Sequence, residues 1–298
     1  MSTDKLKLPA YGGQALIEGV LMRGSNYVSA AVRDPNGNIV IKSEELGGLY
    51  KTKIAKIPFL RGIIILWDSL GLGTKYITYS ANIQTGEDEK IEGPMLGLTV
   101  LFSFAIAIGL FFLAPAALVQ GLEKWLHLSA FVGNLIEGAI RLGLVILYIW
   151  AIGKMPDIHR VFSYHGAEHK TINAFENGVE LTPENVAKYP LQHPRCGTGF
   201  ILILVIFSVI LFSFLGPMSM LMRLATRVVL LPVLVVFAYE YVRFTANHLD
   251  NPIAKVLAFP GLAMQKLTTV EPTPEMLEVS IAAFKAMYDQ EQQLAQSK

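Results

Sequence analysis

Long apolar runs alternate with polar stretches along this chain, and the runs are of membrane-crossing length. We expect four spans, at residues 95–119, 136–153, 199–218 and 224–244. Each approaches the roughly 20 apolar residues that cover about 30 Å of hydrocarbon. The second span carries Glu137 and Arg141 near its start, and because they are four residues apart they can pair on one helix face.

The first part of the chain is more polar and has other periodicities. Residues 9–26 are rich in glycine, which is typical of tight turns or close backbone approach. We interpret them either as a bent lead-in to the next strand or as a contributor to a functional site. Residues 27–45 alternate with period two around a turn at 34–38, which predicts a β-hairpin. One hairpin is marginally stable alone, so we expect it to pack on the lead-in.

Residues 57–83 predict a helix that either lies along the membrane interface or re-enters the bilayer, and the sequence favours neither. The lysines before it, Lys51, Lys53 and Lys56, would face anionic headgroups. In the tail, Pro260-Gly261 predicts a break, and Thr273-Pro274-Glu275 predicts a helix start, with a cap, a proline at the first position and an acid in the first turn.

These patterns predict an α-helical polytopic membrane protein with a small N-terminal β-hairpin and a cytoplasmic helical cap. We divide it into residues 1–94, a cytoplasmic segment, and 95–245, a four-helix transmembrane domain. The second part includes a histidine-rich loop at 154–198, and residues 246–298 form a cytoplasmic helical tail. Lysine and arginine gather before the first span, in this loop and in the tail, so the positive-inside rule places both termini and the loop in the cytoplasm.

Composition agrees with a membrane protein. Only 16% of residues are charged and 52% are hydrophobic, whereas soluble domains carry about 25% charged residues. A net charge of +1 argues against nucleic acid as a partner. The single cysteine cannot form an internal disulfide, and the polar, basic start does not predict a secretory signal peptide. The partners we expect are membrane lipids, and the sequence predicts no oligomeric state.

The candidate chemistry lies in the polar interval between the second and third spans. His165-Gly166-Ala167-Glu168-His169 places two imidazoles four residues apart, on one helix face, with a carboxylate beside them. Such a pair can hold a divalent ion and the carboxylate can polarise a water, which is the inverted zinc-peptidase arrangement. Gly166 weakens the helix prediction, so His165 could stand at a helix start instead.

A second block, His193-Pro194-Arg195-Cys196, strengthens the prediction of a metal, for which zinc is the expected ion. If His165, His169, His193 and Cys196 all ligate, the site is closed and structural. If the first two combine with Glu240, or with one of the later pair, one position stays open and Glu168 can act as general base. The alternative is that these residues are buried polar groups that tie the loop down by hydrogen bonds.

Further polar residues fall on the same predicted membrane face and could support the site. Glu240, Arg243 and Asn247 lie three and four apart on one stripe of the fourth span, where a buried carboxylate needs a partner. The supporting residues that we predict are Gln14, Glu18, Arg23, Arg243, Asn247, His248 and Asp250.

Several blocks resemble the YqhQ-like family of bacterial membrane proteins. They are Tyr11-Gly-Gly-Gln-Ala-Leu-Ile-Glu-Gly-Val-Leu-Met-Arg-Gly24, His165-Gly-Ala-Glu-His-Lys170, His193-Pro-Arg-Cys-Gly-Thr198 and Pro260-Gly-Leu-Ala-Met-Gln-Lys-Leu-Thr-Thr269. The resemblance covers essentially the whole chain. It implies a multi-pass protein of the bacterial inner membrane, in a family described as a domain of unknown function and a predicted metal-dependent enzyme.

The sequence is compatible with three functions. The first is a metal-dependent hydrolase that faces the cytoplasm and acts on a membrane peptide or a lipid-linked molecule. The second is a scaffold or assembly factor in which a metal or polar cluster staples the cytoplasmic cap onto the spans. The third is a transporter or channel, favoured by Glu240 and Arg243 inside a span.

Overall fold

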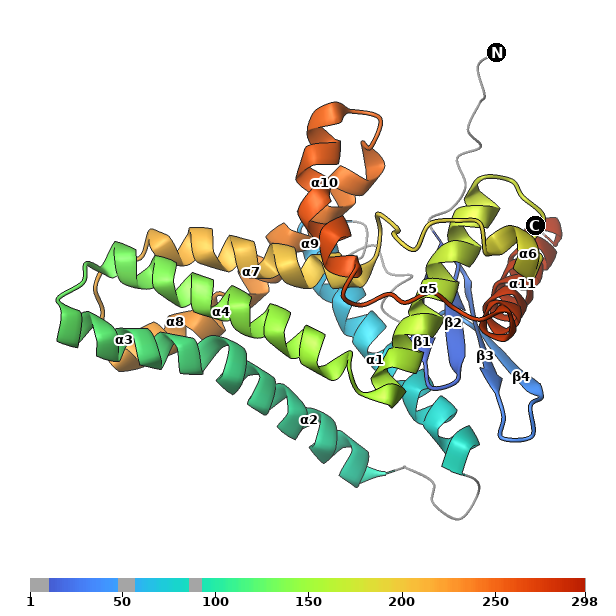
Figure 1. Cartoon of the computed structure of the whole chain (residues 1–298), viewed down its shortest axis with the longest axis horizontal. Coiled ribbons are helices and arrows are strands. Elements are labelled where there is room, and N and C mark those ends of the chain that lie inside the picture. The colour runs from blue at the N-terminus through green and yellow to red at the C-terminus, as the bar shows by residue number, and fades with distance from the viewer. Residues whose placement is uncertain (1–10, 48–56, 86–92, 298) are drawn as a thin grey trace.

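The structure is a computed structural model that describes residues 11–47, 57–85 and 93–297. Figure 1 shows two parts along the longest axis: a sheet covered by helices at one end, and a bundle of helices at the other. The strands are β1 (Gly12–Leu16), β2 (Gly19–Arg23), β3 (Tyr27–Arg33) and β4 (Ile39–Glu45). The helices are α1 (Leu60–Thr85), α2 (Pro94–Ile108), a π-helical turn η3 (Gly109–Leu113), α3 (Ala114–Leu126), α4 (Ala130–Ile152), α5 (Pro156–Glu176), α6 (Pro183–Val186), α7 (Gly197–Ser213), α8 (Met220–Val229), α9 (Leu231–Asn247), α10 (Pro252–Gln265) and α11 (Pro274–Gln296).

The four strands form one antiparallel sheet in the order β1-β2-β3-β4. The predicted hairpin at 27–45 is confirmed as β3 and β4. The glycine-rich stretch is more than a bent lead-in, because it forms the paired strands β1 and β2. Their tight turn contains Glu18 at a φ of 51°, a conformation that residues other than glycine rarely adopt.

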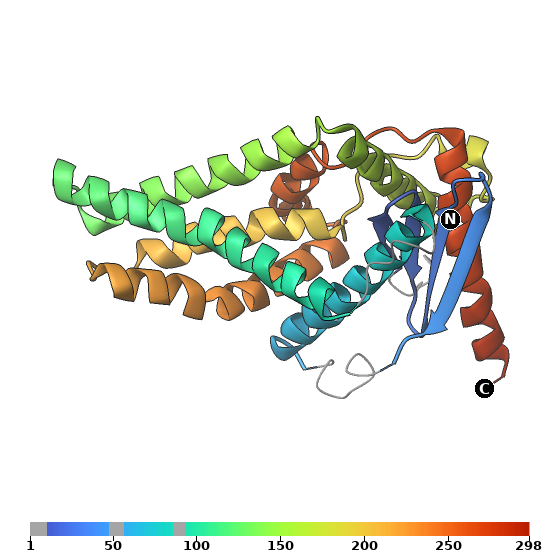
Figure 2. The same cartoon turned by 90° about the horizontal axis from the view of Figure 1, so that it is seen from below.

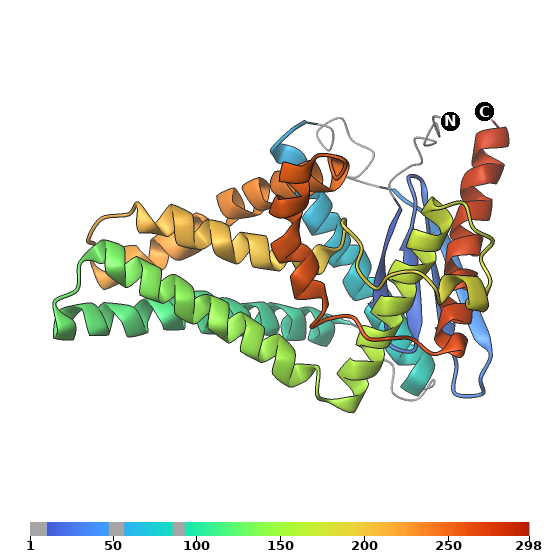
Figure 3. The same cartoon turned by 45° about the horizontal axis from the view of Figure 1, so that its top comes forward.

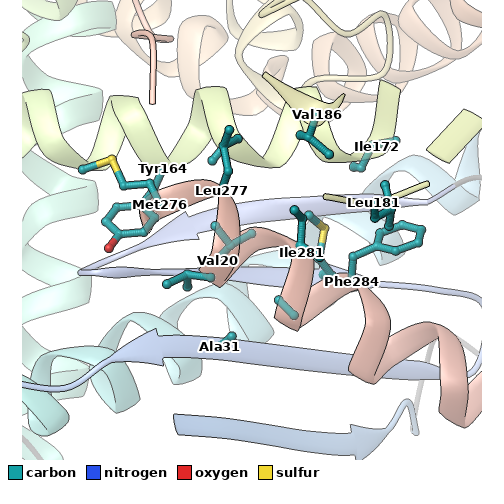
Figure 4. Close-up of a cluster of buried hydrophobic side chains, with 14 of the residues drawn as sticks. Val20, Ala31, Tyr164, Ile172, Leu181, Val186, Met276, Leu277, Ile281 and Phe284 are labelled. Carbon is teal, nitrogen blue, oxygen red and sulfur yellow. The ribbon is translucent and has the colours of Figure 1, made fainter. Parts of the chain in front are cut away.

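Both faces of the sheet are covered, and strand alternation decides which side chain goes where. Val20 and Ala31 point to one face and pack with residues of α5 and α11, the cluster shown in Figure 4. Leu21 and Val32 point to the other face and pack against Tyr76 of α1. Figure 2 shows the resulting order, with α1 on one side of the sheet and α11 on the other.

Helix α1 connects the two parts of the molecule. Arg61 near its start forms an ion pair with Glu240 on α9, and Tyr76 near its end is buried against the sheet. Whether residues 57–83 lie along the membrane interface or re-enter the bilayer stays a prediction. The lysines expected to face headgroups, Lys51, Lys53 and Lys56, lie outside the described residues.

The bundle contains the apolar helices. Two of them are long and apolar enough to cross a membrane, Gly97–Leu126 and Ala130–Ile152, and a third candidate is the pair α8 and α9, bent by 40°. Helix α7 is apolar but has only 17 residues. The described residues therefore contain two or three candidate spans where the sequence predicted four. The first continues past its predicted end at residue 119 to Leu126, and Pro115, the second residue of α3, does not end the helix.

A cluster of charged side chains is buried inside the bundle. The predicted pair of Glu137 and Arg141 is confirmed at 2.6 Å, and both side chains are about 1% exposed. Arg227 from α8 joins them, 2.7 Å from the same carboxylate. Its guanidinium also lies over the ring of Phe212, 4.2 Å from the centroid. Opposite charges and an aromatic face together compensate the burial of these groups.

The C-terminal part brings one confirmation and one correction. Thr273 occupies the N-cap position of α11 with Pro274 at the first position, as predicted, although its side chain makes no capping hydrogen bond to the backbone. The helix packs on the sheet through Ile281 and Phe284. The expected break at Pro260-Gly261 is wrong, because α10 continues through both residues. A Cβ added at Gly199 would lie 3.2 Å from Cα of Gly261, which is closer than most real Cβ contacts, so glycine at position 199 lets α7 pack closely on α10 (Figure 3).

Candidate metal centre

The two predicted histidine ligands lie on α5, well inside the helix. Pro156 at the first position and Asp157 in the first turn start α5, so His165 does not stand at a helix start as Gly166 had indicated. Gly166 is instead required by packing, because a Cβ there would lie 2.2 Å from the carbonyl oxygen of Val270. The rings of His165 and His169 share one face, with centroids 4.3 Å apart.

Backbone carbonyls orient both imidazoles. Nδ1 of His165 lies 2.8 Å from the carbonyl oxygen of Thr268, and Nδ1 of His169 lies 2.5 Å from that of Leu191. A carbonyl oxygen only accepts, so each Nδ1 carries the proton and donates it. In the neutral ring, each Nε2 then keeps its lone pair, and that of His165 faces the thiol of Cys196. Fixing Nδ1–H on a carbonyl is the usual way in which proteins prepare a histidine for a metal.

Cys196 completes a cluster of three possible ligands, which we call the His2Cys cluster (His165, His169 and Cys196). It caps the first turn of α7, where its Sγ accepts a hydrogen bond from the backbone N–H of Thr198, and it is buried. Sγ lies 3.3 Å from Nε2 of His165. One ligand atom from each of the three residues lies within 4.8 Å of the others.

The donor set fits a zinc ion. Imidazole nitrogen and cysteine sulfur are ligands that zinc prefers, and three protein ligands are typical of sites that keep a fourth position open for water or substrate. The carbonyl partners of Nδ1 also match the outer-shell hydrogen bonds found around such ions. The His2Cys cluster could therefore hold a divalent ion.

Glu168 lies beside the cluster in an apolar setting. Its Oε2 is 4.0 Å from Nε2 of His165, and the side chain is 6% exposed. Burial raises the pKa of Glu168 to about 7, against the opposing effects of His165 and a backbone hydrogen bond from Gly13. A Cβ at Gly13 would lie 2.9 Å from Cγ of Glu168 and 2.4 Å from the carbonyl oxygen of Leu21. Glycine at this position of β1 is what lets the sheet approach the carboxylate.

His193 lies next to the cluster but has other partners. Its Nε2 is 3.7 Å from Oε2 of Glu176, a carboxylate that also binds Arg195. Burial lowers the pKa of His193, although the hydrogen bond to Glu176 opposes this effect. Gln265 of α10 holds the backbone of His193 through hydrogen bonds of 2.8 and 2.9 Å. The structure thus places His193 in a supporting network and not in a closed set of four ligands.

The structure does not bring Glu240 to the cluster. Both of its carboxylate oxygens accept hydrogen bonds from Arg61, at 2.7 and 2.5 Å. The predicted role of Glu240 as a ligand is therefore replaced by a link between α9 and α1. The transporter hypothesis, which depended on Glu240 and Arg243 inside a span, stays a prediction.

The other predicted supporting residues are spread over the structure. Gln14 packs against Gly73 of α1. Arg23 binds Asp68 at 2.7 Å, which ties β2 to α1. Glu18 receives two hydrogen bonds from Arg160 on α5, five residues before His165, and so helps to position the site helix. Exposed positions at the end of α9 hold Arg243, Asn247, His248 and Asp250.

The residues that sequence reasoning missed act mainly through their backbone. Leu191 and Thr268 contribute carbonyl oxygens, and Gly13 contributes the absence of a side chain. Every residue has a backbone carbonyl whatever its side chain, so a sequence motif could not predict that these two carbonyls bind the histidines. Thr268 and Gly13 do lie in the blocks that resemble the YqhQ-like family.

The protein combines a sheet covered by α1, α5 and α11 with a largely apolar helical bundle, and the His2Cys cluster lies between α5 and the start of α7. The chain belongs to the family described as "Protein of unknown function (DUF1385)", whose model matches residues 57–290. It is 34% identical over 302 residues to the "Uncharacterized protein YqhQ" of Bacillus subtilis (strain 168), a match that covers 96% of this chain and 94% of that protein. The resemblance to YqhQ-like proteins is confirmed. No solved structure matches the chain.

Proposed function

We propose that this protein is a metal-dependent hydrolase of the bacterial inner membrane, with both termini and its metal centre on the cytoplasmic side. The observation that carries the proposal is the convergence of two imidazole nitrogens and one sulfur within 4.8 Å. Each imidazole is held by a carbonyl so that Nε2 keeps its lone pair. The Cys196 thiol, 3.3 Å from Nε2 of His165, can give up its proton to a divalent ion that takes its place among the three ligand atoms.

Glu168 is the residue that would move the proton. An ion bound to the His2Cys cluster would supply Lewis-acid polarisation of the scissile group and lower the pKa of a nearby water. The carboxylate of Glu168, 4.0 Å from Nε2 of His165, accepts a proton from the attacking water and returns it to the leaving group. Burial against β1 keeps bulk water away from this carboxylate, so its proton exchanges mainly with the reacting groups.

The position of the centre favours a substrate that belongs to the membrane. Cys196 caps the start of the apolar helix α7, and His165 and His169 lie on the polar helix α5. The cluster therefore sits where a bilayer surface would meet the sheet. A membrane peptide and a lipid-linked molecule both reach such a place.

Metal content tests the proposal. We expect purified wild-type protein to bind about one zinc ion per chain, and His169→Ala to bind none. Glu168→Gln should keep the ion and the fold but lose hydrolysis of 4-methylumbelliferyl palmitate, because only the proton acceptor is removed. A wild-type protein that takes up no zinc, or a Glu168→Gln variant as active as wild type, would overturn it.

The structure also favours one alternative role for the same ion. The ligands and their carbonyl partners come from α5, α7, the connection before α7 and the connection between α10 and α11. An ion there would staple these segments together, as a structural site in a scaffold does. A Glu168→Gln variant with unchanged cellular function, beside a His169→Ala variant that unfolds, would identify the scaffold.

A further inference from the structure

Helix α10 runs across the direction of the bundle helices, at the end of the bundle that faces the sheet (Figure 1). It packs on the start of α7, where Gly261 meets Gly199 in the first turn of that helix. Helix α7 is apolar and has 17 residues, so at 1.5 Å per residue it is about 25 Å long and reaches across most of a hydrocarbon core of about 30 Å. In a bundle that crosses a bilayer, a helix beside this first turn lies at the depth of the membrane surface.

The face of α10 that points away from the protein is apolar. Ala254 and Gln265 are buried against the neighbouring segments. Ile253, Val256 and Phe259 point to other sides of the helix and are 68%, 73% and 67% exposed. A helix at a protein surface in water normally turns charged and polar residues outward. The outward face of α10 therefore suits hydrocarbon better than water.

Two lysines line one edge of this apolar face. Lys255 and Lys266, which is the C-cap residue, are exposed and eleven residues apart. Eleven residues are about three helical turns, so the two side chains point to nearly the same side. In an amphipathic helix at a bilayer surface, apolar side chains lie about 5–10 Å into the boundary between headgroups and acyl chains, and lysines along the edge reach anionic headgroups. The pattern of α10 is that of such a helix.

The last turn of α10 contacts the supports of the His2Cys cluster. The side chain of Gln265 holds the backbone of His193 through hydrogen bonds of 2.8 and 2.9 Å. The carbonyl oxygen of Gln265 accepts a hydrogen bond from the backbone N–H of Thr268 at 2.9 Å, and the carbonyl oxygen of Thr268 in turn accepts one from Nδ1 of His165. The depth of α10 in a bilayer would consequently set the depth of the cluster.

We propose that α10 is an interfacial helix, with its apolar outer face inserted into the cytoplasmic leaflet and with Lys255 and Lys266 at anionic headgroups. Lipid is favoured over a protein partner because the helix lies at the end of the apolar bundle and its cationic edge matches the headgroups expected at that depth. The inference rests on the part of the proposed function that places the bundle in a membrane, and it needs no bound ion. It holds the His2Cys cluster just below the headgroups, where a membrane substrate meets it.

Spin labels test the depth of α10 in nanodiscs that contain anionic phosphatidylglycerol. A label on Val256→Cys should collide more often with oxygen, which concentrates in hydrocarbon, than with the nickel complex NiEDDA, which stays in water. Leu147→Cys on α4, at a position that is 57% exposed, is the hydrocarbon reference, and Lys285→Cys on the exposed side of α11 is the aqueous reference. We expect a ratio of oxygen to nickel collisions at position 256 that is close to that at position 147 and several-fold above that at position 285. The background from the buried thiol of Cys196 is measured on wild-type protein.

The outcomes separate this inference from the proposed function. A ratio at Val256→Cys as low as at Lys285→Cys, beside a high ratio at Leu147→Cys, would overturn the inference and leave the bundle in the membrane. Low ratios at both Val256→Cys and Leu147→Cys would take the bundle out of the bilayer, and the proposed membrane location would fail with it. A label at position 256 that neither reagent reaches would identify a protein partner or a second copy on this face, and would also overturn the inference.

Charge reversal tests the edge of lysines. Lys255→Glu and Lys266→Glu should each lower the collision ratio at Val256→Cys in phosphatidylglycerol nanodiscs, because the new carboxylate is repelled by the headgroups. Neither should change it in nanodiscs of zwitterionic phosphatidylcholine. Lys188→Glu, at an exposed position outside α10, is the matched control and should have no effect in either lipid. Equal effects in both lipids, or no effect in either, would contradict the headgroup contact.

Discussion

Two polar clusters of this protein differ in the groups that they bring together. In the bundle, Glu137 accepts hydrogen bonds from Arg141 and Arg227, so positive and negative groups face each other at 2.6 to 2.8 Å. In the His2Cys cluster, two imidazole nitrogens and one thiol sulfur converge, and each of them can ligate a metal. The opposite charges attract one another and hold the bundle helices together. The three ligand atoms carry no such opposite charges, and the proposed ion would join them; this difference separates the architectural cluster from the candidate metal centre.

The largest effect is expected in the bundle. Glu137→Ala removes the carboxylate that compensates two buried guanidinium groups, so we expect a loss of roughly 3–5 kcal/mol in the free energy of unfolding. Thermal unfolding in detergent, monitored by circular dichroism, would measure it. Leu147→Ala, on the exposed face of the same helix, is the control and should change the midpoint little. Similar midpoints for both variants would contradict the architectural role of the cluster.

The His2Cys cluster should respond to zinc, and the bundle cluster should not. Zinc at about a thousand times its dissociation constant would stabilise wild-type protein by roughly 4 kcal/mol through mass action. His169→Ala should abolish this shift because one of three ligands is lost. The readout is the unfolding midpoint with and without added zinc. A midpoint in His169→Ala that rises with zinc as in wild type would disprove the ligand set.

The next prediction concerns Gly13, which lies where β1 contacts Glu168 beside the His2Cys cluster. Gly13→Ala would place a methyl group 2.4 Å from the carbonyl oxygen of Leu21 and 2.9 Å from Cγ of Glu168. We expect a cost of about 1–3 kcal/mol from overpacking, and lower hydrolytic activity because the carboxylate must move. Gly12→Ala is a matched control, since a Cβ there has nothing within 4 Å. Equal stability and activity of the two variants would show that the contact is unimportant.

The smallest effect concerns the pair that positions α5. The hydrogen bond from Arg160 holds the pKa of Glu18 below its usual value. A carboxyl group whose pKa is lowered by folding contributes stability above its unfolded pKa, and this contribution is lost as pH falls through the folded pKa. Glu18→Gln should therefore cost at most about 1 kcal/mol at pH 7, and this difference should disappear as pH falls through the lowered pKa of Glu18. Unfolding midpoints of wild type and variant, measured from pH 7 to pH 3, should converge in acid; a constant difference would refute the assignment.

The sequence predicted the parts of this fold that follow from hydrophobic periodicity and from side chains close together along the chain. The hairpin at 27–45, the start of α11 and the pair of Glu137 and Arg141 all depend on neighbours along the chain, so local patterns were sufficient. The number of spans was harder, because α7 is short and the segment that contains α8 and α9 bends at residue 230. Strands β1 and β2 were missed because their glycines resemble a turn until β3 pairs with them.

In the candidate site, too, the features set by sequence spacing were predictable and those set by tertiary contacts were not. His165 and His169 share a helix face because they are four residues apart, and this spacing can be read from the sequence. Cys196 meets them only through the path from α5 to α7, and the sequence left it as one of several choices beside His193 and Glu240. The choice among the three depends on tertiary partners. Glu176, the last residue of α5, contacts His193, and Arg61 of α1 binds Glu240.

In the proposed centre, one ion binds between two imidazoles and a thiolate. Zinc K-edge X-ray absorption on protein loaded with one equivalent of zinc tests this ligand set. We expect one sulfur at about 2.3 Å and nitrogen ligands at about 2.0 Å, with the sulfur contribution lost in Cys196→Ser. A wild-type spectrum with only oxygen and nitrogen neighbours, unchanged in Cys196→Ser, would contradict it.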